Sequence, residues 1–293
     1  MASTTTKPTI LLQLDTDPQP SVFDGVVAVD AGVDHLFRHG GVTVEAVRDL
    51  VYGALFTRGT SDLRSTAIFV GGSDVARGEE ILEAVKATFF GGFRVSVLLD
   101  ANGANTTAAA AVLAAREGMG GSLEGARAAV LAATGPVGQR VARLLARLGA
   151  QVSVGSRRLD RATATAEALA AATGTPFQPF ATNEPDDLAR GLAGAAVVVA
   201  AGAAGVTLLP ASIRAELREL RVAVDLNAVP PLGIEGVKAS DKGAERDGLK
   251  IWGALGVGGT KMKIHRKAVQ SLFEANDRVL DAEEVLAIGQ SLS

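Results

Sequence analysis

The sequence has no cysteine among its 293 residues, few aromatic residues (4%, with a single Trp and a single Tyr) and no excess of positive charge. Without cysteine there can be no disulfide framework, no thiolate-bound zinc or iron–sulfur cluster and no thiol nucleophile, so redox chemistry would need a bound cofactor. The 29 Lys and Arg residues against 32 Asp and Glu residues give a net charge of −3. No basic stripe alternates with aromatic residues, and we therefore expect no nucleic-acid partner.

Long uncharged runs are also scarce, and one extends from Leu192 to Leu209. It is about as long as the shortest membrane span. It consists mostly of Ala and Gly around a Val197–Val199 trio, which favours a buried parallel strand followed by a turn. Near the start of the chain, Asp15 ends the apolar run from Thr9 to Leu14 too early for a signal peptide. We expect a cytoplasmic protein without a membrane partner.

Short aliphatic runs alternate with helical patterns along the chain. The predicted strands are Ile10–Leu14, Ala67–Val70, Val95–Leu99, Ala128–Ala132, Val152–Val154, Ala196–Ala200 and Val222–Asp225. The predicted helices are Val44–Phe56, Val75–Phe89, Asn105–Glu117, Val137–Leu148, Leu159–Ala172, Thr260–Phe273 and Ala282–Gln290. This alternation predicts βαβ units and mostly parallel sheets, so the fold class is α/β.

A glycine-rich segment at residues 118–125 interrupts the pattern and marks a domain boundary. We expect a smaller α/β domain over residues 1–120, completed by C-terminal helices at 260–293, and a Rossmann-type domain over residues 121–259. Ligands of open α/β sheets bind at the carboxyl ends of the strands, so two facing domains would form a cleft.

A strand, a tight turn and a helix follow one another at Ala128–Gly149 and match the dinucleotide pattern G-x-G-x-x-G, with Ala133 in place of the first glycine. An ordinary βα turn is the alternative. The helix N-terminus would offer N–H groups to phosphate oxygens, and proline suits a first helical turn. The predicted pyrophosphate-binding residues are Thr134, Gly135, Pro136, Val137 and Gly138.

The end of the next strand indicates which dinucleotide is bound. A site for NAD carries Asp or Glu about 20 residues after the glycines, to accept from the ribose 2′-OH. This chain has Ser156, Arg157 and Arg158 instead, whose hydroxyl and guanidinium groups favour the 2′-phosphate of NADP. A solvated arginine pair is the alternative. Beyond two later strands, Ala201, Gly202 and Asn227 are candidates for the nicotinamide end, although turn punctuation explains the glycine equally well.

Polar residues also gather after the first strand, where Asp15, Thr16 and Asp17 precede Phe23 and Asp24. Such density at a strand end suggests a binding site, and capping of a helix by Ser21 is a compatible alternative. Further candidates follow the strand that ends at Leu99. Of these, Asn102 and Thr106 are assigned to the same site, whereas helix capping alone explains Asn105.

Lys261 follows a glycine-rich segment and is predicted in the first turn of a helix, where a positive charge is unfavourable. A residue placed against a local rule points to function. His265 lies one turn later and is equally well explained by packing. His35 and His39 lack the glutamate of a zinc-protease motif and are predicted to be structural or surface residues, so no metal site is expected.

These segments together resemble the NADP-dependent methylene-tetrahydromethanopterin dehydrogenase family over nearly the whole chain. The resembling segments are 15–17 with 21–24, 65–72, 102–107, 134–138, 227–228 with 230–234, and 254–261. Ala133 departs from the family's usual glycine, and Ser156-Arg157-Arg158 varies its usual Gly-Arg-Lys, which leaves use of both NAD and NADP open.

The resemblance implies hydride transfer from the N–CH₂–N carbon of a methylene pterin to the nicotinamide, in one-carbon metabolism and formaldehyde oxidation. It implies a homo-oligomer, a trimer or hexamer, and assigns Lys261 as the active-site lysine that orients the pterin. No proton need be abstracted, so orientation of the reacting carbons would supply most of the catalysis. The alternatives are a methylene-tetrahydrofolate or shikimate-type dehydrogenase and, in another class, a non-catalytic NADP sensor.

Overall fold

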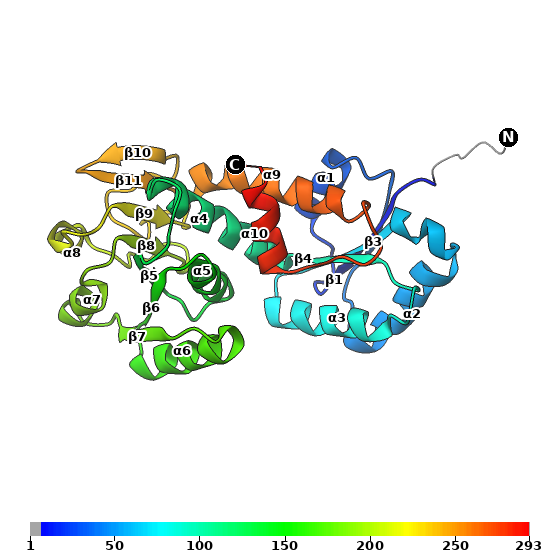
Figure 1. Cartoon of the computed structure of the whole chain (residues 1–293), viewed down its shortest axis with the longest axis horizontal. Helices are drawn as coiled ribbons and strands as arrows, with labels where there is room; N and C mark the ends of the chain where they lie inside the picture. Colours follow the sequence, from blue (N-terminus) through cyan, green and yellow to red (C-terminus); the bar gives the residue numbers. More distant parts are fainter. Residues whose placement is uncertain (1–6, 293) are drawn as a thin grey trace. The chain divides into compact units, whose positions relative to one another are not determined.

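The computed structural model describes residues 7–292 and divides the chain into two compact units (Figure 1). The first comprises Met1–Thr106 and Met262–Ser293, and the second comprises Thr107–Lys261. Each division falls inside a helix that the two units share, namely α4 (Ala104–Gly118) and α9 (Ala254–Ser271). The expected boundaries, after residues 120 and 259, assign these helices differently, and the domain limits stay a prediction.

A parallel five-stranded sheet in the order β12-β4-β3-β1-β2 forms the centre of the first unit. Its strands are β1 (Ile10–Asp15), β2 (His35–His39), β3 (Thr66–Gly71), β4 (Ser96–Leu99) and β12 (Val279–Leu280). The chain moves from β1 outward to β2 and then returns to β3 on the other side. The strand order therefore reverses between β1 and β3, which is where ligands bind in doubly wound sheets.

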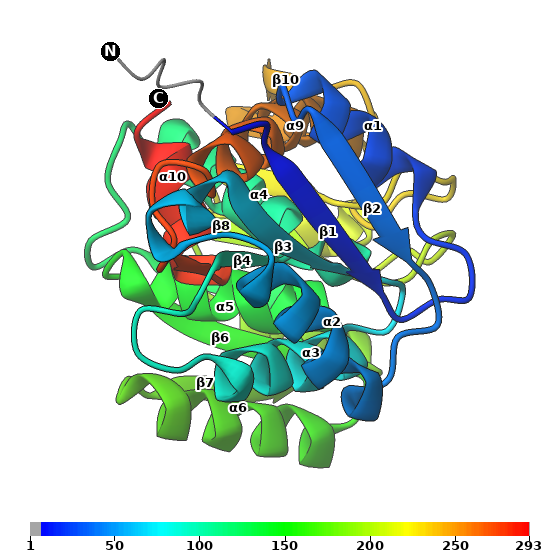
Figure 2. The same cartoon turned by 90° about the vertical axis from the view of Figure 1, so that its right-hand side faces the viewer.

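Helices cover both faces of this sheet, with α1 on one face and α2 and α3 on the other (Figures 1 and 2). The elements are α1 (Val22–Asp30), α2 (Val44–Phe56), α3 (Val75–Thr88) and α10 (Ala282–Gln290), with short 3₁₀ turns η1 (Thr60–Ser65) and η2 (Ala101–Gly103). All six residues of β3 are buried, as expected for a central strand covered on two sides.

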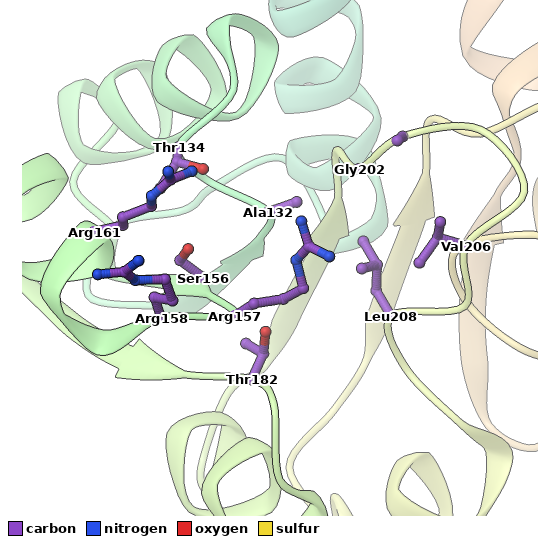
Figure 3. A pocket seen from close by; sticks show the side chains of 11 residues that line it. Ala132, Thr134, Ser156, Arg157, Arg158, Arg161, Thr182, Gly202, Val206 and Leu208 are labelled. Atoms are coloured by element: carbon purple, nitrogen blue, oxygen red, sulfur yellow. The ribbon is translucent and has the colours of Figure 1, made fainter.

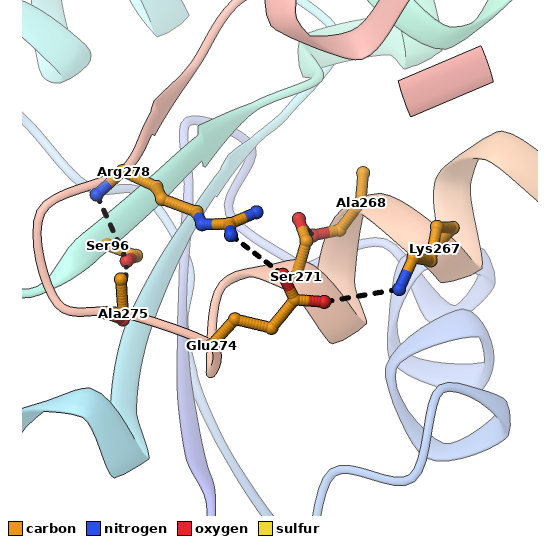
Figure 4. Close-up of polar contacts among 7 residues, drawn as sticks. All are labelled: Ser96, Lys267, Ala268, Ser271, Glu274, Ala275 and Arg278. Atoms are coloured by element: carbon orange, nitrogen blue, oxygen red, sulfur yellow. Dashed lines mark hydrogen bonds and ion pairs between the residues drawn. The ribbon is translucent and has the colours of Figure 1, made fainter. Parts of the chain in front are cut away.

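The C-terminal segment joins the first unit through Ser96, a buried residue of β4 (Figure 4). Its hydroxyl donates to the carbonyl of Ala275 at 2.9 Å and accepts from the backbone N–H of Arg278 at 3.2 Å. Glu274 pairs with Lys267 at 3.1 Å and with Arg278 at 2.7 Å. These contacts fix the turn between α9 and β12 and thereby place β12 beside β4.

The second unit contains a seven-stranded sheet in the order β10-β11-β9-β8-β5-β6-β7. Its strands are β5 (Arg127–Leu131), β6 (Gln151–Ser156), β7 (Phe177–Ala181), β8 (Val197–Ala200), β9 (Val222–Asp225), β10 (Lys242–Arg246) and β11 (Leu249–Trp252). All neighbours are parallel except β10, which forms an antiparallel hairpin with β11. Without β10 the order is that of a Rossmann sheet, and it reverses between β5 and β8.

Helices α5 and α6 lie on one face of this sheet, and α7 and α8 lie on the other (Figure 1). They are α5 (Pro136–Arg147), α6 (Leu159–Thr173), α7 (Pro185–Leu192) and α8 (Ala211–Glu216). The segment from Leu192 to Leu209 contains, as predicted, the fully buried strand β8 and a turn, and its first residue is the last residue of α7. No helix within residues 7–292 has the length and apolar character needed to cross a membrane.

All seven predicted strands and all seven predicted helices are present, and the predicted α/β class is confirmed. Helices α1, α7 and α8 and five strands were not predicted as elements. Four of these strands, β2, β7, β10 and β12, lie at sheet edges, where side chains face water and no aliphatic run is needed. In β7, Pro179 lowers the strand signal, and proline is tolerated there because β7 is an edge strand. The fifth, β11, is four residues long and includes Lys250.

Candidate active site

A pocket of about 690 Å³ opens at the carboxyl ends of β5, β6, β7 and β8 in the second unit (Figure 3). It lies at the position where the strand order reverses, which is the expected place for a dinucleotide. The pocket is lined by Ala132, Thr134, Ser156, Arg157, Arg158, Arg161, Thr182, Gly202, Ala203, Val206 and Leu208. The structure therefore brings together five of the predicted cofactor-binding residues: Thr134, Ser156, Arg157, Arg158 and Gly202.

The turn between β5 and α5 is tightly packed and leads into a helix N-terminus that has no side-chain cap. Pro136 occupies the first turn of α5, as predicted, and the N-cap residue Gly135 offers no side chain to the helix N–H groups. A Cβ atom on Gly138 would lie 2.8 Å from the carbonyl oxygen of Ala132 and from the Cα of Ala133. Glycine is thus required at position 138 for close packing of helix on turn. Ala132 adopts a φ of 56°, which is uncommon for a residue with a side chain.

The remaining predicted cofactor residues do not line this pocket: Gly135, Pro136, Val137, Gly138, Ala201 and Asn227. Asn227 is buried, and both ends of its amide serve its own loop. Its oxygen accepts from Val229 N at 2.9 Å, and its nitrogen donates to Pro231 O at 3.1 Å. Asp225 accepts from Asn227 N and Ile234 N at 3.0 and 2.8 Å. Burial raises the pKa of Asp225, and backbone N–H donors oppose that rise.

The loop after β1 in the first unit is organised by two carboxylates. Asp15 is completely buried and accepts from Asp17 N at 2.9 Å, Ser21 N at 3.0 Å and the Gln13 amide at 3.2 Å. Asp17 accepts from the N–H and the hydroxyl of Ser73, at 3.0 and 2.8 Å. The predicted cap by Ser21 is confirmed, since its hydroxyl accepts from Asp24 N. These bonds hold the β1 and β3 loops together where the strand order reverses.

Thr16 stands at the centre of this reversal point. It is buried, and its hydroxyl has no hydrogen-bond partner within residues 7–292. Gly72 follows β3 with a φ of 109°, and a Cβ atom there would lie 2.0 Å from the Thr16 hydroxyl oxygen. A buried hydroxyl without a partner is rare in folded proteins, and it marks this point of the sheet as unusual.

A buried polar cluster extends from the end of β4 to α1 and α9. Thr106 donates to Asp100 at 2.6 Å, and His265 Nδ1 lies 3.9 Å from the same carboxylate. The His265 ring stacks on Phe69 with centroids 5.6 Å apart and lies 6.3 Å from Phe23. Burial raises the pKa of Asp24, while the nearby His265 partly lowers it. Phe23 and Asn102 are exposed, whereas Thr106 is fully buried.

Two expectations in this part of the sequence were wrong. Lys261 does not lie in a first turn, because α9 begins at Ala254. It is about two turns inside the helix and half-buried, so the argument from an unfavourable helix terminus does not apply to it. Asn105 is not a simple cap, since its amide donates to Leu99 O at 2.6 Å and to Asp281 at 2.8 Å, which links β4 to the start of α10.

Asp100 was not predicted as a site residue, and packing explained His265 equally well. The signal available was Asp100 at a strand end, followed by Thr106, but the pairing with a histidine 165 positions later could not be read from spacing. His35 and His39 lie on the edge strand β2, exposed and half-buried, which fits the surface role expected of them. Within residues 7–292, no three acidic or histidine side chains are arranged to hold a metal ion.

Comparison with known proteins identifies relatives along nearly the whole chain. Residues 22–102 match the family described as "Methylene-tetrahydromethanopterin dehydrogenase, N-terminal". The chain is 46% identical over 284 residues to the bifunctional protein MdtA of Methylorubrum extorquens, with 97% of this chain and 99% of that protein covered. It is 30% identical over 265 residues to the NAD(P)-dependent methylenetetrahydromethanopterin dehydrogenase of the same organism, with 88% and 89% covered. The chain belongs to the methylene-tetrahydromethanopterin dehydrogenase family.

Solved structures agree with this fold. Shikimate 5-dehydrogenase from Listeria monocytogenes superposes with a TM-score of 0.53 at 17% identity, covering 99% of this chain and 98% of that one. Quinate dehydrogenase from Corynebacterium glutamicum gives 0.52 at 16% identity, covering 97% and 99%. Likeness at this level shows the fold alone. The predicted family and the prediction of an oxidoreductase are confirmed by the family match and the relatives.

Proposed function

We propose that this member of the family catalyses the reversible, NADP-dependent dehydrogenation of methylene-tetrahydromethanopterin to methenyl-tetrahydromethanopterin, in one-carbon metabolism and formaldehyde oxidation. The observation that carries the proposal is the pocket at the β5/β8 reversal point, where the turn into α5 and three arginines lie together in a chain of this family. The NAD(P)-dependent relative supports a nicotinamide cofactor. A homo-oligomer and a cytoplasmic location stay predictions.

The pocket residues fit a phosphorylated dinucleotide. The uncapped N-terminus of α5 supplies N–H groups for the pyrophosphate, and Gly138 allows the close approach of helix and turn. Ser156 at the end of β6 and the arginines beside it replace the carboxylate of an NAD site. Gly202 after β8 presents only backbone to the same pocket, beside Leu208.

When bound, NADP⁺ would supply the hydride acceptor: both electrons and one hydrogen would leave the methylene carbon together, and the pterin would become the delocalised methenyl cation. No side chain of the protein has to remove a proton from the pterin in this step. The protein's residues bind and orient the two reactants, which can contribute several orders of magnitude to the rate. Catalysis by binding and orientation needs no thiol nucleophile, which is consistent with a chain that has no cysteine.

For the pterin we propose the carboxyl ends of β1, β3 and β4 in the first unit. Phe23 is exposed and can stack on a planar ring, and Asp24 can offset the positive charge that develops. Asp17 and Asn102 would supply further polar contacts, and Thr16, whose hydroxyl is buried without a partner, lies at the same strand ends. Asp15 and Thr106 would act by holding the loops in place, because their side chains are buried and already hydrogen-bonded. Lys261 would orient the substrate.

A spectrophotometric assay with each pterin and each nucleotide tests this function directly. We expect reduction of NADP with methylene-tetrahydromethanopterin, at a kcat/KM higher than with NAD. Methylene-tetrahydrofolate should be compared in the same assay, since the sequence left the pterin open. Nucleotide binding without turnover of either pterin would instead establish the non-catalytic sensor.

A further inference from the structure

The arginines at the mouth of the nucleotide pocket are not equivalent. Arg158 forms a two-bond pair with Asp160, with Nε–Oδ1 at 3.0 Å and Nη2–Oδ2 at 2.5 Å. That pair lowers the pKa of the Asp160 carboxyl. The guanidinium of Arg161 makes no ion pair within 4.0 Å in the part of the chain that the structure describes, yet Arg161 lines the pocket. In Figure 3, Arg161 points toward the Thr134 side of the pocket, whereas Arg157 points toward Gly202.

Arg161 also occupies a position that helix energetics disfavour. It is the third residue of α6, and α6 begins at Leu159 after the N-cap Arg158, which makes no side-chain cap. Cations near a helix N-terminus oppose the macrodipole and the free N–H groups there. A bound anion would reverse that cost, because it would attract the guanidinium and the helix terminus together. The same helix-terminus argument, applied to Lys261 from the sequence, does not hold for that residue because α9 begins at Ala254. For Arg161 the observed start of α6 supports it.

We propose that Arg161 is the principal residue that selects NADP over NAD, and that Asp160 limits this selection by occupying Arg158 and placing a carboxylate beside the 2′-phosphate. The proposal rests on the proposed function, because it concerns the same cofactor. Arg161 and Asp160 are thereby added to the residues predicted to determine cofactor preference, and Arg158 is assigned a smaller contribution to the affinity for the 2′-phosphate.

The magnitudes allow the two arginines to be distinguished. The Arg158–Asp160 pair is exposed, so the interaction between its members is worth at most about fivefold in an equilibrium constant. It therefore weakens the contribution of Arg158 without abolishing it. Arg161 breaks no such pair when it binds a phosphate, and a charge-assisted hydrogen bond to a phosphate is worth about tenfold or more in affinity.

The test measures the affinities of adenosine 2′,5′-bisphosphate and 5′-AMP by titration calorimetry on the full chain. These probes differ only in the 2′-phosphate. For Arg161→Gln we expect a loss of about tenfold or more for the bisphosphate and less than about twofold for 5′-AMP. For Arg158→Gln we expect a loss of no more than about threefold for the bisphosphate. For Asp160→Asn we expect a gain of about two- to fivefold for the bisphosphate, because Arg158 is released.

Two matched controls separate this effect from a general change of charge. Arg218→Gln removes an exposed arginine of the same unit away from the pocket lining. Asp186→Asn removes an acid at the same helical position in α7 that Asp160 holds in α6. Both should leave the ratio of the two affinities within about twofold of wild type.

The outcomes distinguish the inference from the function on which it rests. A wild-type preference for the bisphosphate that survives Arg161→Gln, or that falls equally in Arg158→Gln, overturns the inference and leaves NADP preference intact. Equal binding of the two probes by the wild type overturns both. A loss confined to Arg161→Gln, together with a gain in Asp160→Asn, supports the proposal.

Discussion

Lys261 is half-buried, about two turns inside α9, and its helix continues to His265 in the polar cluster of the first unit. Because the proposed reaction removes no proton, this ammonium group would orient the pterin and balance charge rather than act as a base. Replacing Lys261 should therefore weaken the binding and positioning of the pterin.

For Lys261→Met we expect kcat/KM for the pterin to fall by about 10- to 100-fold, as for the loss of one positioning charge. The KM for NADP should change by less than about threefold. Steady-state kinetics with each reactant varied in turn checks this. Values of kcat and KM that both stay near wild type would show that the lysine was wrongly assigned.

Asp24 gives a prediction that depends on pH. Burial raises the pKa of its carboxyl in the folded protein above the ordinary value, so the folded chain binds a proton more tightly than the unfolded chain does. This group's contribution to stability is therefore full at low pH and is lost as pH rises through the raised pKa. The neighbouring groups are His265, which opposes the shift, and Asp100 and Asp15, which enhance it.

The unfolding free energy of wild type minus that of Asp24→Asn should accordingly become more favourable to wild type as pH falls from 7 to 4. Urea titrations at several pH values measure it. The same variant should lose the acid limb of the kcat/KM profile that arises from protonation of Asp24. A difference in stability that is independent of pH would contradict the raised pKa.

Among the single elements, α5 requires a glycine at position 138, whereas α2 does not require the glycine at position 53. A Cβ atom at Gly138 would meet backbone atoms at 2.8 Å, whereas one at Gly53 inside α2 would meet nothing within 4 Å. Gly138→Ala should therefore lower both stability and affinity for NADP, because the turn and helix must separate. Gly53→Ala should raise stability by about 0.5–1 kcal/mol, the usual gain in a helix interior. Thermal unfolding with and without NADP compares them.

The attachment of the C-terminal segment depends on Ser96, whose buried hydroxyl makes two hydrogen bonds across the α9–β12 turn (Figure 4). Ser96→Ala leaves a carbonyl and an N–H without that partner and should destabilise the protein by about 1–3 kcal/mol. Ser271→Ala is the matched control, because the Ser271 hydroxyl donates only to Ala268 O within its own helix turn. Urea unfolding of the two variants should give a clearly larger loss for Ser96→Ala, and equal losses would contradict the anchoring role.

Elements with strong periodicity were predictable from sequence, and elements defined by their neighbours were not. The buried strand at Val197–Ala200 and the helix at Val44–Phe56 follow from aliphatic content and spacing. The edge strand at His35–His39 is polar enough to resemble a loop, and only its pairing with β1 makes it a strand. The start of α9 was placed six residues too late, at 260 rather than 254, because glycines at 256, 258 and 259 weakened the helical signal.

For the whole molecule, the sequence indicated the two α/β units, the strand, turn and helix at Ala128–Gly149, and the family. It could not show that Asn227 serves its own loop, or that Arg158 is paired while Arg161 lines the pocket, since both depend on side-chain partners in the folded chain. It also could not associate His265 with Asp100. Residue types at strand ends predict where a site lies, and the hydrogen-bonding partners determine which of those side chains are available to a ligand.

In the proposed reaction, hydrogen passes directly from the methylene carbon of the pterin to the nicotinamide. The measurement that tests this uses methylene-tetrahydromethanopterin in which both hydrogens of the methylene carbon are replaced by deuterium, with the reduced nucleotide analysed by mass spectrometry and NMR. We expect one deuterium at C4 of the nicotinamide for each NADPH formed and none released to water. Deuterium recovered in water, with unlabelled NADPH, would contradict it.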